Sequence, residues 1–83
     1  MYLIQAESHF DAAHFLAGYQ GKCKNLHGHR WRVTAEAGAR ELETSGQSRG
    51  MVLDFSELKS ALRELTDRLD HALIYEEGTL RET

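Results

Sequence analysis

The chain has 83 residues, a formal net charge of −3 and a single cysteine. A chain this short forms at most one domain, and it buries little surface unless a metal or a partner subunit adds stability. Its Lys and Arg residues are scattered, which argues against nucleic-acid binding, and no apolar run approaches the roughly 20 residues that cross a bilayer. We therefore predict a soluble cytoplasmic protein without nucleic-acid or membrane partners, whose one cysteine remains a thiol.

The first segment, residues 2–14, alternates between apolar and polar side chains. The even positions are mostly apolar: Tyr2, Ile4, Ala6, Phe10 and Ala12. The odd positions carry polar groups: Gln5, Glu7, His9 and Asp11. A period of two is typical of a half-buried strand. His14 continues the even, inward set, whereas His9 belongs to the outward set and is predicted to be a surface residue.

The second strand is predicted from Leu26 to about Ala37, after a loop over residues 16–26 that is rich in Gly and Lys. Within this strand His27 and His29 lie on the same face, together with the apolar residues. Gly28 between them is small enough to allow a close approach. We expect the two strands to be joined by either a wide hairpin or a loop that acts as a lid.

A helix is predicted after a polar connection over residues 38–50. Asp54 is placed to cap its N-terminus, and Glu57 follows three residues later, as in a capping box. Apolar side chains then recur at gaps of three and four, which predicts one buried helical stripe: Phe55, Leu58, Leu62, Leu65 and Leu69. The helix is expected to end near Leu69, and the tail that follows has no strong period.

Three histidines converge if the two predicted strands pair. His14 ends the first strand, and His27 and His29 begin the second. Zinc held by three protein ligands with an open fourth position is the catalytic arrangement, whereas four protein ligands make a closed structural site. The alternative is three ordinary core or surface histidines. That alternative fits poorly with imidazoles on an apolar face that lacks an evident anionic partner.

Cys23 lies four residues before His27 and has two functional interpretations. As a fourth ligand it would close the metal site and make the protein a small metal-stabilised module. As a nonligand beside the cation it would become a thiolate that accepts protons. An inert, buried cysteine is the third interpretation, although the surrounding loop is rich in Gly and Lys.

Asp70 and His71 form a second candidate pair at the C-terminal end of the helix. A carboxylate that orients and charges an imidazole makes a proton-transfer pair. The same two residues also fit a simple helix cap, because a cationic imidazole is favoured by the helix dipole at this end. Adjacent residues need not face each other, so the sequence leaves both interpretations open.

Four motifs occur together in an order and spacing that resemble the 6-pyruvoyltetrahydropterin synthase family. They are Phe10-x-Ala12-Ala13-His14, Cys23-x-x-x-His27-Gly28-His29, Gly50-Met51-Val52-Leu53-Asp54-Phe55 and Leu69-Asp70-His71. The resemblance covers residues 2 to about 73. The spacing Cys-x-x-x-His-Gly-His is similar to that of the bacterial branch, which makes 6-carboxy-5,6,7,8-tetrahydropterin for queuosine biosynthesis.

The resemblance implies an α+β tunnelling fold, in which a four-stranded antiparallel sheet carries helices on one face. It also implies assembly through trimers into a homo-hexamer, with active sites between subunits. Zn²⁺ would be bound by His14, His27 and His29. Proton-transfer roles would fall to Cys23 as a general base and to Asp70 and His71 as a second pair.

The implied reaction is the zinc-dependent conversion of 7,8-dihydroneopterin triphosphate to 6-carboxy-5,6,7,8-tetrahydropterin, with release of acetaldehyde and triphosphate. Zinc as a Lewis acid and two bases would shuttle protons in an internal redox isomerisation, without nicotinamide or flavin. A 6-pyruvoyltetrahydropterin synthase is the nearest enzymatic alternative. The alternative from another class is a noncatalytic zinc-binding assembly module in which Cys23 closes the site.

The sequence departs from the family pattern in three places. It contains no proline, so the Pro-Thr pair and the glutamate that anchors the pterin have no counterpart, and neither do the later strands. Ala72 and Leu73 follow Asp70-His71 where Leu-Asn is usual, and Trp31 stands where Tyr is common. We therefore expect residues 1–83 to be a single, C-terminally incomplete domain of strand, strand and helix, which binds metal but cannot anchor the pterin alone.

Overall fold

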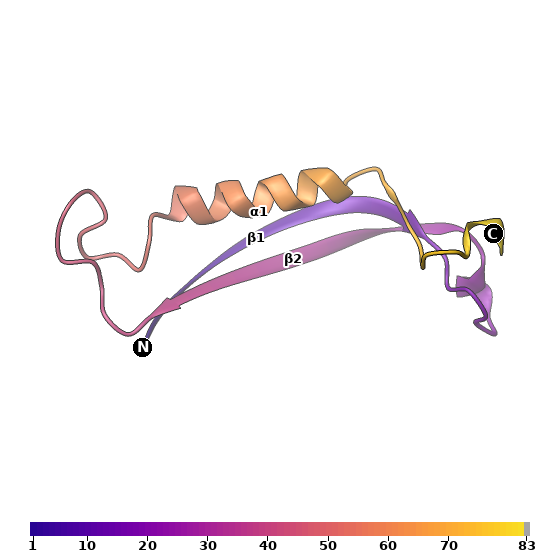
Figure 1. Ribbon diagram of the computed structural model, residues 1–83, viewed down its shortest axis with the longest axis horizontal. Coiled ribbons are helices and arrows are strands. Elements are labelled where there is room, and N and C mark those ends of the chain that lie inside the picture. Colours follow the sequence, from indigo (N-terminus) through magenta and orange to yellow (C-terminus); the bar gives the residue numbers. More distant parts are fainter. Residues whose placement is uncertain (83) are drawn as a thin grey trace.

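A computed structural model describes residues 1–82, which form a long two-stranded ribbon with one helix lying along it (Figure 1). The elements in chain order are β1 (Tyr2–His14), a 3₁₀ turn (Lys22–Lys24), β2 (His27–Ala39), α1 (Phe55–Leu69), β3 (Leu73–Ile74) and a second 3₁₀ turn (Leu80–Glu82). The three strands form one sheet in the order β2-β1-β3. Over the same residues, no helix has the length and hydropathy to cross a membrane.

Strands β1 and β2 pair antiparallel in one unbroken register. It runs from Tyr2 opposite Ala39 to His14 opposite His27. The two strands and the wide hairpin loop between them confirm the elements predicted from the alternating pattern. Because side chains alternate between faces, even positions of β1 share a face with odd positions of β2. The apolar residues of both strands therefore lie on one face of the ribbon.

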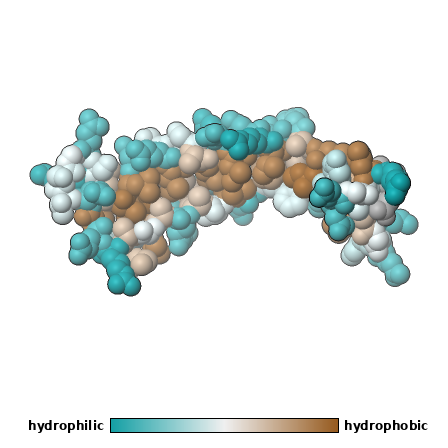
Figure 2. Space-filling model, viewed as in Figure 1, coloured by the Kyte–Doolittle hydropathy of each residue, from teal (hydrophilic) through white to brown (hydrophobic). Residues whose placement is uncertain are grey.

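Helix α1 packs on this apolar face and lies mainly over β1. The Ser8 and Thr66 hydroxyls, one from the strand and one from the helix, are hydrogen-bonded at 2.9 Å. The buried side chains lie at this contact and just beyond it: Ala6, Phe10, Ala12, Phe15, Leu62 and Thr66. Apolar surface runs along most of the length of the molecule in the view of Figure 2.

The predicted start of α1 is confirmed. The Asp54 carboxylate accepts hydrogen bonds from the backbone N–H and the hydroxyl of Ser56, both at 2.8 Å. This cap satisfies one of the backbone donors that have no partner at a helix N-terminus. The side-chain bond reaches the second helical residue, Ser56, rather than the third, Glu57, to which a capping box would direct it.

The prediction of one buried stripe along α1 is wrong at two positions. Leu62 is buried, but Phe55 and Leu65 are 49% and 50% exposed. The helix lies over β1 and barely touches β2, so the ribbon covers only a narrow strip of it. Thr66 occupies that strip and is 2% exposed. A hydroxyl is accepted there because Ser8 provides its partner.

The chain after the helix contains a strand that sequence analysis missed. β3 pairs parallel with β1, with Leu73 opposite Ala13 and Ile74 opposite His14. A strand of two residues is too short to show a period, which explains why its sequence gave no signal. The sheet is therefore mixed rather than purely antiparallel. The arrangement is α+β with the helix on one face, and it agrees with a partial tunnelling fold.

Candidate active site

Three imidazoles meet where the ribbon ends and the hairpin loop begins. His14 lies opposite His27 in the strand register, and His29 lies opposite Ala12 on the same face. The ring centroids are 4.5 Å apart for His14 and His27, 4.9 Å for His14 and His29, and 4.7 Å for His27 and His29. One nitrogen from each ring lies within 4.8 Å of the others. The structure thus brings together the three histidines that the sequence singled out.

The cluster has the dimensions and the chemistry of a three-histidine metal site. A tetrahedral zinc ion with bonds of about 2.0–2.1 Å places its ligand nitrogens about 3.3–3.4 Å apart, so small side-chain rotations would close the observed spacing. The Nε2 atoms of His14 and His27 are buried, and neither has a hydrogen-bond partner among the described residues. A cation would satisfy both atoms. The donor set therefore fits Zn²⁺.

A hydrogen bond fixes which nitrogen of His27 faces the cluster. Its Nδ1 lies 2.7 Å from the carbonyl oxygen of Asn25. A carbonyl only accepts, so Nδ1 carries the proton and Nε2 keeps its lone pair. Burial lowers the pKa of His14, and the neighbouring His27 and His29 lower it further. Both effects favour the neutral imidazoles that metal binding requires.

The Trp31 ring packs against two of the three histidines. Its ring centroid lies 5.1 Å from that of His14 and 5.5 Å from that of His29. On its other side Trp31 stacks on Phe10, at 6.0 Å and an interplanar angle of 9°. An apolar surround limits water access to a metal site and orients its ligands. The alternating pattern of the second strand predicted this face for Trp31, two residues after His29, but not its contacts with the histidines.

Cys23 lies in the 3₁₀ turn of the hairpin loop and is half-buried. Its carbonyl accepts a hydrogen bond of 2.9 Å from the backbone N–H of Leu16, which ties the two sides of the loop together. In the described part of the chain, the group of converging ligand atoms contains the three histidines and not the Cys23 sulfur. This placement favours an open three-ligand site over a closed one, while the role of Cys23 as a base remains a prediction.

Asp70 and His71 contact each other directly. The Asp70 carboxylate accepts from the backbone N–H of Asp11 at 2.9 Å, and its other oxygen lies 2.8 Å from Nδ1 of His71. The hydrogen bond from Asp11 lowers the pKa of Asp70, with a smaller contribution from His71. The Asp70 carboxylate in turn raises the pKa of His71. The geometry of a proton-transfer pair is therefore present, although its function remains a prediction.

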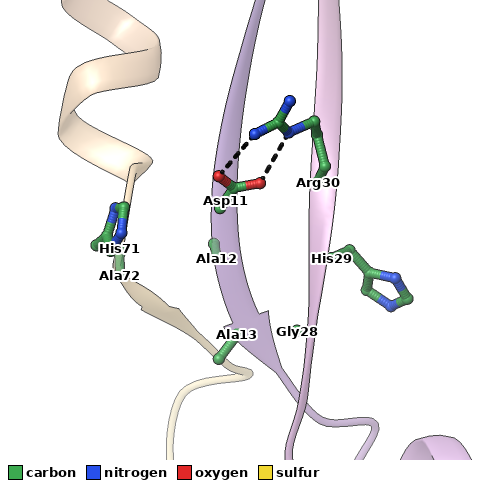
Figure 3. A pocket seen from close by; sticks show the side chains of 8 residues that line it. All are labelled: Asp11, Ala12, Ala13, Gly28, His29, Arg30, His71 and Ala72. Carbon is green, nitrogen blue, oxygen red and sulfur yellow. Dashed lines mark hydrogen bonds and ion pairs between the residues drawn. The ribbon is translucent and has the colours of Figure 1, made fainter.

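This pair lies apart from the histidine cluster. Asp70 and His71 bond to the outer edge of β1, whereas His27 and His29 extend from β2 on the other side of that strand. His71 and Ala72 border a pocket of about 440 Å³, lined also by residues of both strands: Asp11, Ala12, Ala13, Gly28, His29 and Arg30. In Figure 3 the His29 ring points away from the Asp11–Arg30 ion pair that the pocket contains.

The Asp11–Arg30 ion pair is a feature of the site that sequence analysis missed. Arg30 Nε lies 3.1 Å from Asp11 Oδ1, and Arg30 Nη2 lies 3.3 Å from Asp11 Oδ2. The two residues are opposite each other in the register. A signal was present, since both fall on the outward faces of the predicted strands. Only the strand register shows that the two side chains lie opposite each other and can interact.

The sequence is similar to curated enzymes over most or all of its length. It is 44% identical to the 6-carboxy-5,6,7,8-tetrahydropterin synthase of Haemophilus influenzae, over 100% of this chain and 59% of that protein. It is also 44% identical to the protein of the same name from Synechocystis, over 86% of this chain and 56% of the relative. The enzyme of Rickettsia bellii is 37% identical over 83% of this chain and 48% of its own length.

The chain therefore spans less than two thirds of the length of these relatives. A family model described as 6-pyruvoyl tetrahydropterin synthase matches residues 3–83. The match includes all four motifs, the histidine cluster that β1 and β2 bring together, and the Asp70–His71 pair. On this evidence the chain belongs to the 6-pyruvoyl tetrahydropterin synthase family.

Proposed function

We propose that this chain provides the metal-binding part of a zinc-dependent 6-carboxy-5,6,7,8-tetrahydropterin synthase. The proposed substrate is 7,8-dihydroneopterin triphosphate, the leaving products are acetaldehyde and triphosphate, and the proposed pathway is queuosine biosynthesis. The observation that carries the proposal is the convergence of three imidazoles, two of which have a buried Nε2 atom without a partner in residues 1–82. The names of the similar enzymes from Haemophilus influenzae and Synechocystis support the product.

In this proposal Zn²⁺ is held by His14, His27 and His29, and it supplies Lewis-acid chemistry to the hydroxyls of the substrate side chain. The bond from Asn25 to His27 keeps that ring in the required tautomer. Trp31 and Phe10 exclude water from one side of the ligands, which strengthens electrostatic interactions inside the site.

The chain also offers two groups that exchange protons. Cys23 lies in the loop next to the histidine cluster and accepts a proton as a thiolate. Asp70 binds the Nδ1 proton of His71, which leaves Nε2 of His71 as the atom that gains or loses a proton. The Asp70 carboxylate raises the pKa of His71, so the imidazolium form that can donate a proton persists to higher pH than in an ordinary histidine.

We further propose that the complete site is assembled between subunits of a homo-hexamer. Within this chain the Asp70–His71 pair contacts the outer edge of β1, and the histidines of β2 lie on the other side. A pair contributed by a neighbouring subunit would bring a second proton-transfer group to the metal. The glutamate that holds the pterin has no counterpart in these 83 residues, so it too would come from outside them.

Metal analysis of three variants tests the proposal. In a preparation with the length of the relatives, we expect Cys23→Ala to keep its zinc while turnover, followed as triphosphate release, is lost. His29→Ala should lose the zinc, and His9→Ala, which removes an exposed histidine of the same strand pair, should lose neither. Loss of zinc from Cys23→Ala would instead indicate a closed four-ligand site, and thus the noncatalytic zinc-binding module.

A further inference from the structure

The backbone of Asp11 holds both members of the Asp70–His71 pair. Its N–H donates to the Asp70 carboxylate at 2.9 Å, and its carbonyl accepts from the backbone N–H of His71 at 2.6 Å. Two residues further on, the N–H of Ala13 donates to the carbonyl of Ala72 at 3.0 Å. The edge of β1 that faces away from β2 therefore holds the C-terminal end of the helix in place.

His71 is held in a backbone conformation that it would otherwise avoid. Its φ of 58° lies in the left-handed region, and no other residue in positions 1–82 except glycine has a positive φ. Such a conformation costs of order 1 kcal/mol or more for a residue with a side chain, and it persists only where the surroundings impose it. The bond to the Asp11 carbonyl and the bond between the His71 ring and Asp70 are the interactions that impose it here.

The side chain of Asp11 is fixed from the opposite direction. Arg30 of β2 reaches across the register and binds both Asp11 oxygens, at 3.1 and 3.3 Å (Figure 3). This two-point contact restrains the rotation of Asp11 in a way that a single point charge cannot. Arg30 also follows directly after His29, so β2 carries a candidate metal ligand and this contact on adjacent residues.

We propose that Arg30 is a positioning residue: through Asp11 it fixes the strand edge that holds the Asp70–His71 pair. The inference rests on the proton-transfer role proposed above for that pair. The chain of contacts runs from Arg30 to the Asp11 carboxylate, through the Asp11 peptide to Asp70 and His71. Its effect is to fix the orientation of His71, which lines the pocket.

A role in global stability is a poor explanation for this ion pair. The Arg30 and Asp11 side chains are 65% and 47% exposed. Exposed ion pairs contribute about 0–1 kcal/mol to stability, because solvent screens them and their side chains lose entropy. A variant at Arg30 should therefore fold normally while it loosens the contacts of His71. This separation makes the proposal testable.

The experiment compares Arg30→Gln with Arg32→Gln by NMR. Arg32 is a matched control, because it lies on the same face of β2 and pairs with Glu7 of β1 at 3.8 Å. We expect Arg30→Gln to speed the exchange of the His71 backbone amide by up to about fivefold, the effect of losing an exposed ion pair. The Nδ1 chemical shift of His71 should also move toward that of a free imidazole. Arg32→Gln should change neither.

Kinetic measurements on Arg30 variants and exchange measurements that include Asp11→Asn distinguish this proposal from the proposed enzymatic function. In the active protein, Arg30→Gln should lower kcat with little change in KM or zinc content, and Arg30→Lys should restore only part of the loss. Equal His71 exchange rates in wild type, Arg30→Gln and Asp11→Asn would overturn the positioning role even if the enzyme is active. Absence of turnover in a wild-type preparation with the length of the relatives would contradict the proposed function, while the NMR comparison would still decide the role of Arg30.

Discussion

At the scale of single residues, the hydrogen bond between His27 and Asn25 determines which atoms can meet a metal. In this bond Nδ1 of His27 carries the proton, so the lone pair of the ring is on Nε2. The Nε2 atom is buried and has no hydrogen-bond partner in the described chain. A buried acceptor without a partner is costly, at about 1–3 kcal/mol, unless something satisfies it. The cluster is therefore arranged for a ligand, in contrast to three ordinary core histidines.

Trp31 provides a direct optical test of metal binding. It is the only tryptophan in the chain, and its ring lies 5.1 and 5.5 Å from those of His14 and His29. Addition of Co²⁺, a quencher that occupies zinc sites, should strongly reduce tryptophan fluorescence in proportion to the sites filled. His14→Ala should abolish this saturable decrease, and His9→Ala should preserve it. An unchanged titration in His14→Ala would show that the metal binds elsewhere.

The Asp70–His71 pair makes a prediction about pH. The Asp70 carboxylate raises the pKa of His71 above its ordinary value of 6.5, so Asp70→Asn should move that pKa down toward 6.5. NMR titration of the His71 ring measures the change directly. A His71 pKa that is unchanged in Asp70→Asn would show that the contact is absent in solution.

The sign of the effect on stability follows from the same shifts. The stabilisation from His71 is fully present below pH 6.5, the ordinary pKa of histidine, and is lost as the pH rises through the raised pKa of the folded state. The stabilisation from Asp70 is present above pH 3.8, the ordinary pKa of aspartate, and is lost as the pH falls through the lowered pKa of the folded state. The pair therefore stabilises the fold most between pH 3.8 and pH 6.5. In Asp70→Asn, the denaturation midpoint should vary less with pH around 6.5 than it does in the wild type.

Residue positions differ in how far the sequence predicts them. His14, His27 and His29 were predictable as a cluster, because strand parity fixes their face and an unbroken register brings them together. The Asp70–His71 contact was not, since it depends on a positive φ that no local pattern indicates for a histidine. Whether adjacent side chains face each other is decided by tertiary contacts.

At the scale of elements, α1 is anchored through a narrow strip of its surface. Leu62 is 5% exposed on the side that meets β1, and Leu65 is 50% exposed one turn further along. We expect Leu62→Ala to lower the free energy of unfolding by about 2–5 kcal/mol, the usual cost of truncating a buried leucine. Leu65→Ala is the matched control, and its cost should be less than half as large.

Chemical denaturation of the two variants measures this difference. Equal losses for Leu62→Ala and Leu65→Ala would indicate that the outer flank of the helix is covered in solution by a partner or by further chain. The helix itself was predictable because Asp54 caps its start and leucines recur along it. Which leucines are buried was not predictable, because that depends on where the helix lies across the ribbon.

At the scale of the whole molecule, the chain is far from a sphere. It measures 55 × 22 × 20 Å, with a radius of gyration of 18.2 Å. A self-contained domain of this length has a radius of gyration of about 12 Å. Large apolar side chains remain half exposed along the ribbon and helix, including Leu3, Phe55 and Leu65. A shape of this kind buries too little surface to be stable alone.

We therefore predict that the chain self-associates and that its thermal stability rises with protein concentration. Sedimentation analysis over a wide concentration range measures the first effect, and calorimetry over the same range measures the second. A stable monomer with a concentration-independent unfolding temperature would contradict the prediction. The same sedimentation experiment tests the proposed hexamer when it is applied to a preparation with the length of the relatives.

The unbroken ladder between β1 and β2 has a consequence for how such sequences tolerate insertions and deletions. A change of length in residues 15–26 leaves the ladder intact, because the hairpin loop absorbs it. Removal of one residue between His29 and the end of β2 reverses the face of every later side chain, so that half-buried positions become exposed. Evolutionary gain or loss of single residues should therefore concentrate in the loop, and be purged from the strand.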